Sequence, residues 1–264
     1  MKAAIIGTGN LGNAIAKGLL TDDKLQSLYL TKRNTKGLEA FAPHDSVIIS
    51  SDNREAVSSA EVLIFAVQPR HLESVLREVQ DLITPKHVII SVITGFGIAK
   101  MEEILGTDKS IIRSMPNTAI SVGKSMTCIC ANQAGKSQIP LVESIFNRLG
   151  ATIEIPEEQM QAATVICASG IAFWMRLIRA TTQGAIQLGF ESEQALKMSM
   201  QTALGAASLL VESGNHPEEE IDRVTTPGGC TIEGLNEMEH RGMSSSLIKG
   251  LVASYEKINQ ITVK

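Results

Sequence analysis

A glycine pattern between an apolar strand and an amphipathic helix is the feature that most restricts the fold of this chain. The apolar run 3–6 leads into Gly7, Gly9 and Gly12, and apolar residues then recur at helical spacing from Ile15. In this order, the first glycine permits a tight turn, the second lets the backbone approach a pyrophosphate, and the third lets the helix pack on the strand. The pattern predicts a dinucleotide site. A glycine turn that binds nothing, or binds another phosphate, is the structural alternative.

The dinucleotide interpretation gives a first set of cofactor contacts along this turn. They are Gly7, Thr8, Gly9, Asn10, Leu11 and Gly12. The residues after the second apolar run, Thr31, Lys32, Arg33 and Asn34, indicate which dinucleotide binds. An Asp or Glu at this corner would bond a free ribose 2′-hydroxyl, but the corner has none, and its cations suit a 2′-phosphate. We therefore predict NADPH, with NADH as the second option and ordinary solvated loop charges as the structural alternative.

Composition excludes several classes of function. The hydrophobic share of 44% and the charged share of 20% are typical of a globular chain with a substantial core. The net charge of −4 and the aromatic content of 3% argue against a nucleic-acid partner. We recognise no secretory signal and no apolar run of membrane-spanning length, so we expect a cytoplasmic protein without membrane contact.

The cysteines do not have the paired spacing of a zinc site. They are Cys128, Cys130, Cys167 and Cys230. Cys128 and Cys130 alternate in a strand-like run and should point to the same face. We expect reduced packing thiols and no metal.

Short apolar runs alternate with helical stretches through the first part of the chain. The further predicted strands are 28–30, 47–50, 62–67, 87–92, 110–115, 126–131 and 152–155, with helices such as 69–82 and 98–105 between them. Such apolar runs suit a parallel sheet buried on both faces. After Pro156 the periodicity is helical almost to the end. The predicted fold class is α/β, a Rossmann-type dinucleotide-binding domain over 1–155 followed by an all-α dimerisation domain over 156–264.

The helices of the second domain carry small residues at core spacing, as between Ala195 and Leu210. A bundle of this size is short of core on its own. An obligate dimer in which helices of two chains complete one bundle would supply the missing apolar contact. A lone bundle packed on the sheet domain is the alternative.

Three further segments could carry chemistry. Val67, Gln68 and Pro69 form a turn at a strand end, where Pro69 can start a helix, and Asn117 follows the strand that ends in Arg113-Ser114-Met115-Pro116. A purely structural turn is the alternative for both segments. The third segment, 225–234, is a hydroxyl-rich glycine turn leading into a helix, where amides and hydroxyls would form a nest for a carboxylate.

Through these motifs the chain resembles the pyrroline-5-carboxylate reductase family over nearly its whole length. The most specific motif is the loop 225–231, whose usual form in that family is hydroxyl-Ser-Pro-Gly-Gly-x-Thr. The resemblance implies that loop amides hold the substrate carboxylate and that the final Thr faces the ring nitrogen. These roles fall on Thr226, Gly228, Gly229 and Thr231, with Thr231 as the catalytic residue.

The same resemblance implies the reaction and the assembly. The expected activity is reduction of 1-pyrroline-5-carboxylate to proline, the last step of proline biosynthesis, with NAD(P)H giving a hydride to the iminium carbon. A protonated imine accepts hydride directly, so positioning can carry the catalysis, and no His or Lys stands out as an acid or base. The family also implies a domain-swapped helical homodimer, sometimes assembled further.

One segment departs from the family. Members commonly carry Ser-Gly-Ser-Gly-Pro-Ala-aromatic at the start of the first long helix of the second domain, where this chain has Cys167-Ala168-Ser169-Gly170-Ile171-Ala172-Phe173. Ser169 is retained as a predicted substrate contact. Ala168 and Ile171 add bulk near the expected pocket, and Phe96 stands where smaller residues are usual on the nicotinamide side.

Two other functions therefore stay open at this point. Another NADPH-dependent reductase of imines or hydroxyacids would share the first domain. A non-catalytic dinucleotide-binding regulatory protein would have its pocket closed by Ile171 and Phe96.

Overall fold

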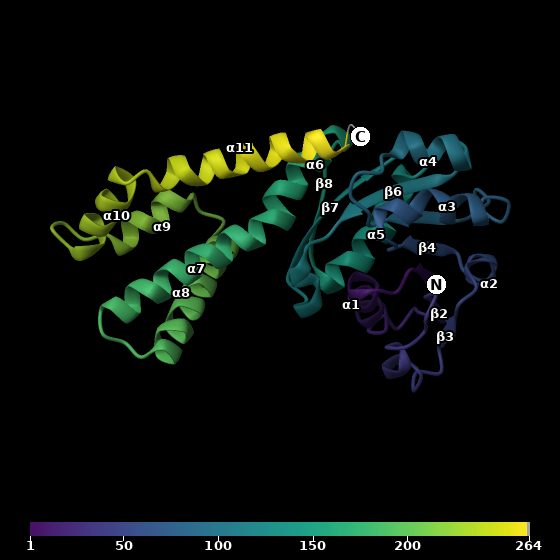
Figure 1. Cartoon of the computed structure of the whole chain (residues 1–264), viewed down its shortest axis with the longest axis horizontal. Coiled ribbons are helices and arrows are strands. Elements are labelled where there is room, and N and C mark those ends of the chain that lie inside the picture. Colours follow the sequence, from purple (N-terminus) through teal and green to yellow (C-terminus); the bar gives the residue numbers. More distant parts are fainter. Residues whose placement is uncertain (263–264) are drawn as a thin grey trace. The chain divides into compact units, whose positions relative to one another are not determined.

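A sheet of eight strands forms the centre of the first of two units into which residues 1–262 fold (Figure 1). In this computed structural model the first unit is Met1–Ala168 with the described residues from Ile258, and the second is Ser169–Lys257. The strands are β1 (Lys2–Ile6), β2 (Ser27–Thr31), β3 (Val47–Ser50), β4 (Val62–Phe65), β5 (Val88–Ser91), β6 (Ser110–Met115), β7 (Ser125–Ala131) and β8 (Gly150–Glu154). Their spatial order is β3-β2-β1-β4-β5-β6-β7-β8. The order reverses between β1 and β4, which is where an open α/β sheet binds its ligand.

Strands β1 to β6 are parallel, and β7 departs from the predicted parallel arrangement. β7 runs antiparallel to β6, whereas β8 pairs parallel with β7. The connection between β6 and β7 covers only residues 116–124. A parallel connection needs a crossover of about a dozen residues or more, so this short link forces the strand to reverse.

Helices and short helical turns connect the strands of the first unit. They are α1 (Asn10–Leu19), η1 (Glu39–Phe41), α2 (Asn53–Ser59), α3 (Pro69–Val79), α4 (Ile98–Leu105), η2 (Thr118–Val122), η3 (Lys136–Gln138), α5 (Ile139–Phe146), η4 (Asn147–Leu149), η5 (Glu157–Gln159), α6 (Met160–Ala163) and the π-helical segment η6 (Thr164–Ser169). The predicted strands 47–50 and 110–115 and the predicted helix 98–105 are confirmed to the residue. The predicted helix 69–82 ends earlier, at Val79.

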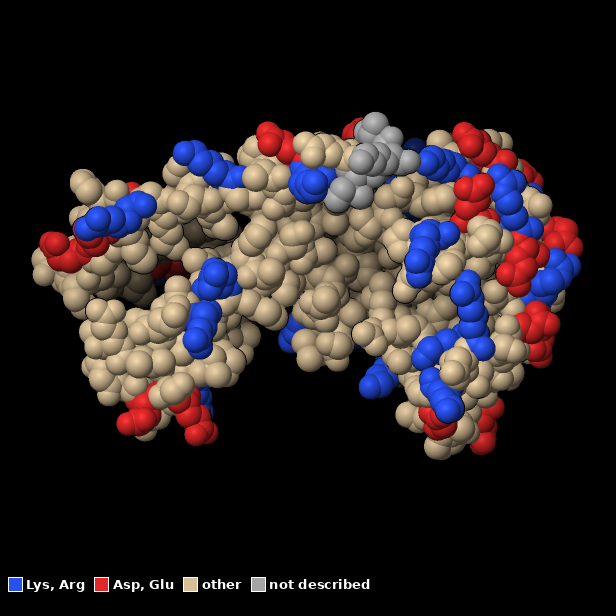
Figure 2. Space-filling view, in the orientation of Figure 1, with Lys and Arg blue, Asp and Glu red and all other residues tan. Residues whose placement is uncertain are grey.

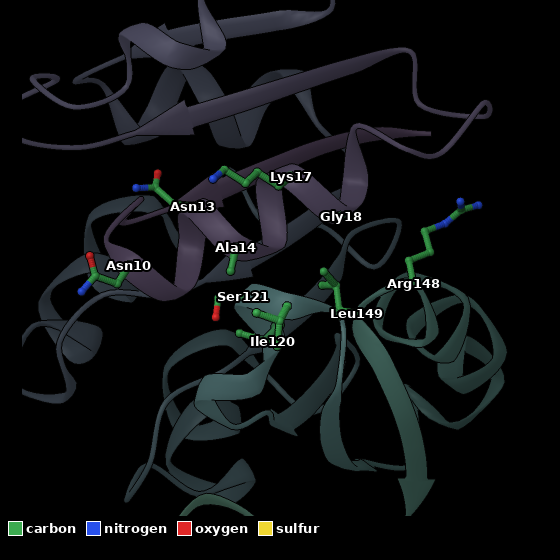
Figure 3. Close-up of a pocket in the computed structure, with 11 residues that line it drawn as sticks. Asn10, Asn13, Ala14, Lys17, Gly18, Ile120, Ser121, Arg148 and Leu149 are labelled. Carbon is green, nitrogen blue, oxygen red and sulfur yellow. The ribbon is translucent and has the colours of Figure 1, made fainter. Parts of the chain in front are cut away.

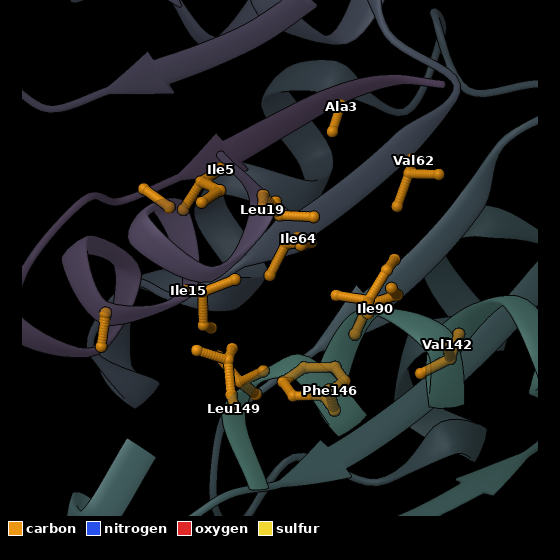
Figure 4. Close-up of a cluster of buried hydrophobic side chains, with 14 of the residues drawn as sticks. Ala3, Ile5, Ile15, Leu19, Val62, Ile64, Ile90, Val142, Phe146 and Leu149 are labelled. Atoms are coloured by element: carbon orange, nitrogen blue, oxygen red, sulfur yellow. The ribbon is translucent and has the colours of Figure 1, made fainter. Parts of the chain in front are cut away.

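The two faces of the sheet carry separate hydrophobic clusters. One cluster joins the sheet to α1 and α5, and Figure 4 shows Ile15 of α1, Ile64 of β4 and Phe146 of α5 within it. The other joins the sheet to α2, α3 and α4, and it contains both Cys128 and Cys130. The predicted shared face of these two cysteines is therefore confirmed. Burial on both faces explains why the strands are almost continuously apolar.

The second unit is all helical. Its helices are α7 (Gly170–Gln187), α8 (Ser192–Ser213), α9 (Pro217–Val224), α10 (Cys230–His240) and the greater part of α11 (Met243–Thr262), whose residues from Ile258 belong to the first unit. Gly214 ends α8 with a left-handed φ of 67°. Many large apolar side chains of these helices are exposed, including Trp174 at 65% and Leu204 at 56%. The unit is short of core, as its sequence predicts.

The first unit continues beyond the predicted boundary at residue 155. Met160 and Val165 are 1% and 3% exposed, and Met160 belongs to a core cluster of the sheet. The first helical turns after Pro156 therefore pack on the sheet. The predicted domains 1–155 and 156–264 follow the change of secondary structure, whereas packing divides the chain at Ala168.

One continuous helical stretch, Glu157–Gln187, is long and apolar enough to cross a membrane by length and composition alone. The sequence analysis recognised no apolar run of that length, so that expectation was wrong for this stretch. Only 22% of its most apolar window is buried within the described chain. A single helix of this kind is weak evidence for a membrane span, because a helix that packs on a partner has the same composition.

Gly150 provides a test of the sheet. It starts β8 with φ of 145°, and a Cβ there would lie 2.0 Å from the backbone oxygen of Ser125. Gly150→Ala should therefore cost both the backbone conformation, about 1–3 kcal/mol, and an overpacking term of about 1–3 kcal/mol.

Gly37→Ala is the matched control. Gly37 has φ of 87°, but a Cβ there would meet only the flexible end of Lys32, at 3.8 Å. In denaturant unfolding, Gly150→Ala should lower the free energy of unfolding clearly more than Gly37→Ala does. Equal losses would contradict the steric argument.

Candidate functional site

The turn after β1 packs so closely on the turn after β4 that Gly7 can carry no side chain. Gly7 has φ of 92°, and a Cβ there would lie 2.5 Å from Cγ1 of Val67 and 2.9 Å from its backbone nitrogen. The amides of Gly7 and Thr8 donate to the carbonyl oxygen of Thr31, at 3.2 and 2.8 Å. These contacts bring the ends of β1, β2 and β4 together where the strand order reverses.

The start of α1 is open on the side from which a pyrophosphate would approach. A Cβ on Gly9 would meet no atom within 4 Å, whereas one on Gly12 would lie 3.1 Å from the carbonyl oxygen of Gly7. Gly9 caps α1 without a side-chain hydrogen bond, and the first turn of α1 contains no acid. Unshielded amides at a helix N-terminus favour an anion. The three glycines therefore have the geometry that a dinucleotide turn requires.

The other predicted residues of the turn offer less side-chain surface. Thr8 is fully buried, and its hydroxyl donates to the carbonyl oxygen of Ile5 at 3.4 Å. Leu11 is half-buried against the core, and Asn10 is exposed on α1. Contact of these residues with a cofactor stays a prediction, and for Thr8 it would involve the backbone.

A cavity of about 350 Å³ lies at this edge of the sheet and includes the predicted 2′-phosphate corner. It is lined by Gly7, Gly9, Thr31, Lys32, Arg33, Asn53, Ala66, Val67, Gln68, Arg70, His71 and Val75. The hydroxyl of Thr31 is buried and donates to Asn53 at 2.7 Å. Lys32 donates to the carbonyl oxygen of Lys36 at 3.0 Å, and Asn34 accepts from the amide of Lys36 at 3.0 Å. The loop after β2 is therefore shaped by its own hydrogen bonds, with its cations at the cavity.

Two basic residues of this cavity were missed by the sequence analysis. Arg70 and His71 follow Pro69, the first residue of α3, and Arg33 Nη2 lies 3.5 Å from Nδ1 of His71. Burial, and then the charges of Arg33 and Arg70, lower the pKa of His71. Arg70 and His71 could have been predicted from their position, because the turns after parallel strands β2 and β4 lie at the same edge of the sheet. The cavity therefore receives basic side chains from two segments, whereas the sequence predicted basic side chains from the loop after β2 alone.

Asn117 has a structural role in this fold. It is 7% exposed, its Nδ2 donates to the carbonyl oxygen of Cys167 at 3.1 Å, and its Oδ1 accepts from the amide of Ala119 at 3.0 Å. Both ends of the amide are thus used within the first unit, capping η2 and holding η6. Direct contact of Asn117 with the cofactor stays a prediction.

Arg113 is a buried cation on β6, 8% exposed. Its Nη1 donates to Oε1 of Glu157 at 2.8 Å, and the same oxygen accepts from the amide of Ile98 at 2.8 Å. The carboxylate thus joins the centre of the sheet to the start of α4. Thr94 and Gly95, in the loop before α4, line a small cavity of about 100 Å³ together with Arg113.

The predicted substrate loop joins α9 to α10 in the second unit. Gly228 has φ of 67°, the amide of Gly229 donates to the carbonyl oxygen of Thr226 at 3.0 Å, and Gly229 caps α10 without a side-chain hydrogen bond. A Cβ on Gly229 would lie 2.5 Å from Oγ1 of Thr226. Thr231 is half-buried in the first turn of α10. The loop therefore closes into a tight turn around open helix amides, as a carboxylate nest requires.

The residues that depart from the family pattern are partly packed. Ser169 and Ile171 are half-buried at the start of α7. Phe96 packs on the core cluster of the first unit, so part of its ring surface is taken up by the core. Ser169 as a substrate contact stays a prediction.

A second cavity, of about 410 Å³, lies along α1 rather than at the strand ends (Figure 3). Ala14 of α1 faces Ile120 and Ser121 of η2 across it. Arg148 borders it but already pairs with Asp22 at 2.9 Å. Of the predicted site residues, Asn10 lines this cavity, and the glycines and cations of the predicted dinucleotide site do not.

Charges of both signs are interspersed over the face of the first unit that Figure 2 presents. Within residues 1–262, no group of three or more His, Cys, Asp and Glu side chains is placed to hold a metal ion.

Two family models match the chain. Residues 2–95 match the model described as NADP oxidoreductase, coenzyme F420-dependent, and residues 157–261 match pyrroline-5-carboxylate reductase dimerisation. The first match covers the glycine turn and the 350 Å³ cavity. The second covers the helical part of the chain, including the loop 225–231.

Named relatives and a solved structure agree with these models. Pyrroline-5-carboxylate reductase 2 of Dictyostelium discoideum is 41% identical, over 96% of this chain and 91% of the relative. Pyrroline-5-carboxylate reductase 1 of the same organism is 44% identical over 96% of this chain, which spans only 48% of that relative. The crystal structure of Plasmodium falciparum pyrroline carboxylate reductase with NADP bound has a TM-score of 0.85 at 26% identity, covering 99% of this chain and 98% of that one. This chain belongs to the pyrroline-5-carboxylate reductase family.

Proposed function

We propose that this protein reduces the cyclic imine 1-pyrroline-5-carboxylate to proline, with NADPH as the hydride donor. The observation that carries the proposal is the near full-length match to a pyrroline-5-carboxylate reductase, at 41% identity. The open glycine turn, the basic cavity and the Thr226–Thr231 loop supply the groups that such a reaction needs.

The residues at the edge of the sheet fit a dinucleotide. Gly7 and Gly9 leave room for a pyrophosphate beside the amides of α1, because a side chain is sterically excluded at one position and the space is open at the other. Lys32, Arg33 and Arg70 would hold a 2′-phosphate through charge-assisted hydrogen bonds. The bound cofactor supplies the hydride.

The loop of the second unit would hold the imine. Open amides at the start of α10 suit its carboxylate, and the Thr231 hydroxyl would bond the ring nitrogen. A hydroxyl can accept a hydrogen bond from the protonated imine and donate one to the amine product. Thr231 would thus orient the ring throughout the reaction, without a separate acid or base.

We also propose that the protein works as a homodimer. The helical part of the chain matches a dimerisation model, and its exposed apolar side chains are the surface that a second copy would cover. Such a partner also accounts for the apolar, poorly buried stretch Glu157–Gln187. A larger assembly and a cytoplasmic location stay predictions.

Replacement of Thr231 tests the reaction. The purified chain should oxidise NADPH in the presence of 1-pyrroline-5-carboxylate, and Thr231→Ala should lower kcat by about a hundredfold, because the ring nitrogen loses its partner. Thr231→Ser retains the hydroxyl and should recover most of the rate. NADPH affinity, measured by fluorescence titration, should hardly change. Tight NADPH binding by the unmodified chain with no imine turnover would instead favour a non-catalytic regulatory protein.

The cavity predicts the basis of cofactor choice. Arg33→Gln and Arg70→Gln should each raise the KM for NADPH by about tenfold, since each removes one charge-assisted contact with the 2′-phosphate. The KM for NADH should stay unchanged. Arg77→Gln is the control, because Arg77 lies on the same helix, pairs with Glu73 and does not line the cavity. A parallel rise in both KM values would exclude 2′-phosphate recognition.

The dimer is testable on α8. Leu204→Glu places a charge on an exposed apolar position of the helical unit and should shift the protein toward monomers in sedimentation velocity. Gln201→Glu adds the same charge at an exposed polar position of that helix and should leave a dimer. A monomeric unmodified protein at micromolar concentration would refute the proposal.

A further inference from the structure

Two of the four cysteines are in contact within the first unit. Sγ of Cys128 lies 3.8 Å from Sγ of Cys167, and one thiol donates a hydrogen bond to the other. Cys128 is on β7, 3% exposed, and Cys167 is half-buried in the π-helical segment η6. The pair therefore joins β7, the strand next to the edge of the sheet, to the segment that leads into α7.

The two thiols are chemically unequal. The hydrogen bond between them lowers the pKa of Cys167 to about 7 and raises the pKa of Cys128. Near neutral pH the thiolate is thus on the half-buried Cys167, and the buried Cys128 keeps its proton. A thiolate in contact with a second thiol is the arrangement found in redox-sensitive cysteine pairs.

We propose that Cys128 and Cys167 form a reversible oxidation site that responds to hydroperoxides. The Cys167 thiolate attacks hydrogen peroxide, which forms a sulfenic acid and releases hydroxide. The Cys128 thiol then attacks the sulfenic sulfur, forming the disulfide and releasing water. Two thiols and one peroxide thus give one disulfide and two waters, and a dithiol reductant returns the pair to its starting state.

Disulfide formation requires the two sulfurs to approach each other, by rotation of the side chains and by any backbone movement that the bond geometry demands. The sulfurs must close from 3.8 Å to about 2.05 Å. β7 is held on both sides by β6 and β8, so Cys128 cannot follow easily. Any backbone movement therefore falls on the π-helical segment, which has fewer constraints than a paired strand.

The movement reaches residues near the proposed sites. The carbonyl oxygen of Cys167 accepts the hydrogen bond from Asn117 at 3.1 Å, and Ser169 follows two residues later. Oxidation should strain this hydrogen bond and shift the start of α7. This consequence for turnover rests on the proposed function, whereas disulfide formation does not.

The test uses the full-length chain with hydrogen peroxide, followed by thiol blocking and peptide mass spectrometry. A Cys128–Cys167 crosslink is expected in the unmodified protein. It is also expected in the control variant Cys130→Ala, because the thiol of Cys130 lies on the same face of β7 but is not part of the pair. It should be absent in Cys167→Ser, which also places serine where the family commonly has it, and in Cys128→Ala, a second variant in case one is unstable. Absence of the crosslink from the unmodified protein would overturn the proposal.

Activity gives a separate readout. Peroxide should lower imine turnover of the unmodified protein by about tenfold, and dithiothreitol should restore it, whereas Cys167→Ser should be unaffected. A crosslink without loss of turnover would overturn the regulatory consequence. If the reduced protein shows no imine turnover, the proposed function fails. The crosslink then still tests whether the two thiols form a disulfide, and NADPH affinity before and after peroxide tests whether that disulfide affects the cofactor site.

Discussion

The contact between Gly7 and Val67 is the constraint on which the nucleotide half of the molecule depends. It fixes the turn after β1 against the turn after β4, and the carbonyl of Thr31 adds the end of β2 through two amide hydrogen bonds. Three strand ends are thereby held close together, with the Val67 side chain occupying the space beside Gly7. The open space beside Gly9 follows directly from this close approach, because the backbone itself forms the floor of the site.

Much of this half was predictable because its signals are local. Strand ends and glycine positions depend on neighbouring residues, so the runs 47–50 and 110–115 and the turn at Gly7 could be predicted from the sequence. The direction of β7 and the convergence of Arg70 and His71 on Arg33 depend on which segments meet in space. The short loop 116–124 indicates the direction of β7, and the order of the strands indicates that Arg70 and His71 approach Arg33. The role of Asn117 was harder, because its partner Cys167 is distant in the sequence.

The helical half of the chain was less predictable from the sequence. Its loop 225–231 has the most specific local pattern in the chain, yet the surface of its helices cannot be interpreted from one copy. Exposed apolar side chains such as Trp174 would be a liability on an isolated protein. The small-residue helices predicted from the sequence and the exposed apolar side chains in the structure both show that one copy buries too little apolar surface. A second subunit would cover that surface.

The reversal at β7 also determines how the chain leaves the sheet. β8 runs in the direction opposite to β6, but its last residue, Glu154, lies level with Ser114, one residue before the end of β6. The segment from Pro156 to Cys167 therefore stays near this end of β6, where Glu157 bonds Arg113 and the carbonyl oxygen of Cys167 accepts from Asn117. The length of this segment determines where Cys167 lies, because each residue added to a helix advances it by about 1.5 Å and turns it by about 100°. The wide π-helical turn at Thr164–Ser169 brings Cys167 against both Asn117 and Cys128, so the segment that leads into α7 is itself held to β7.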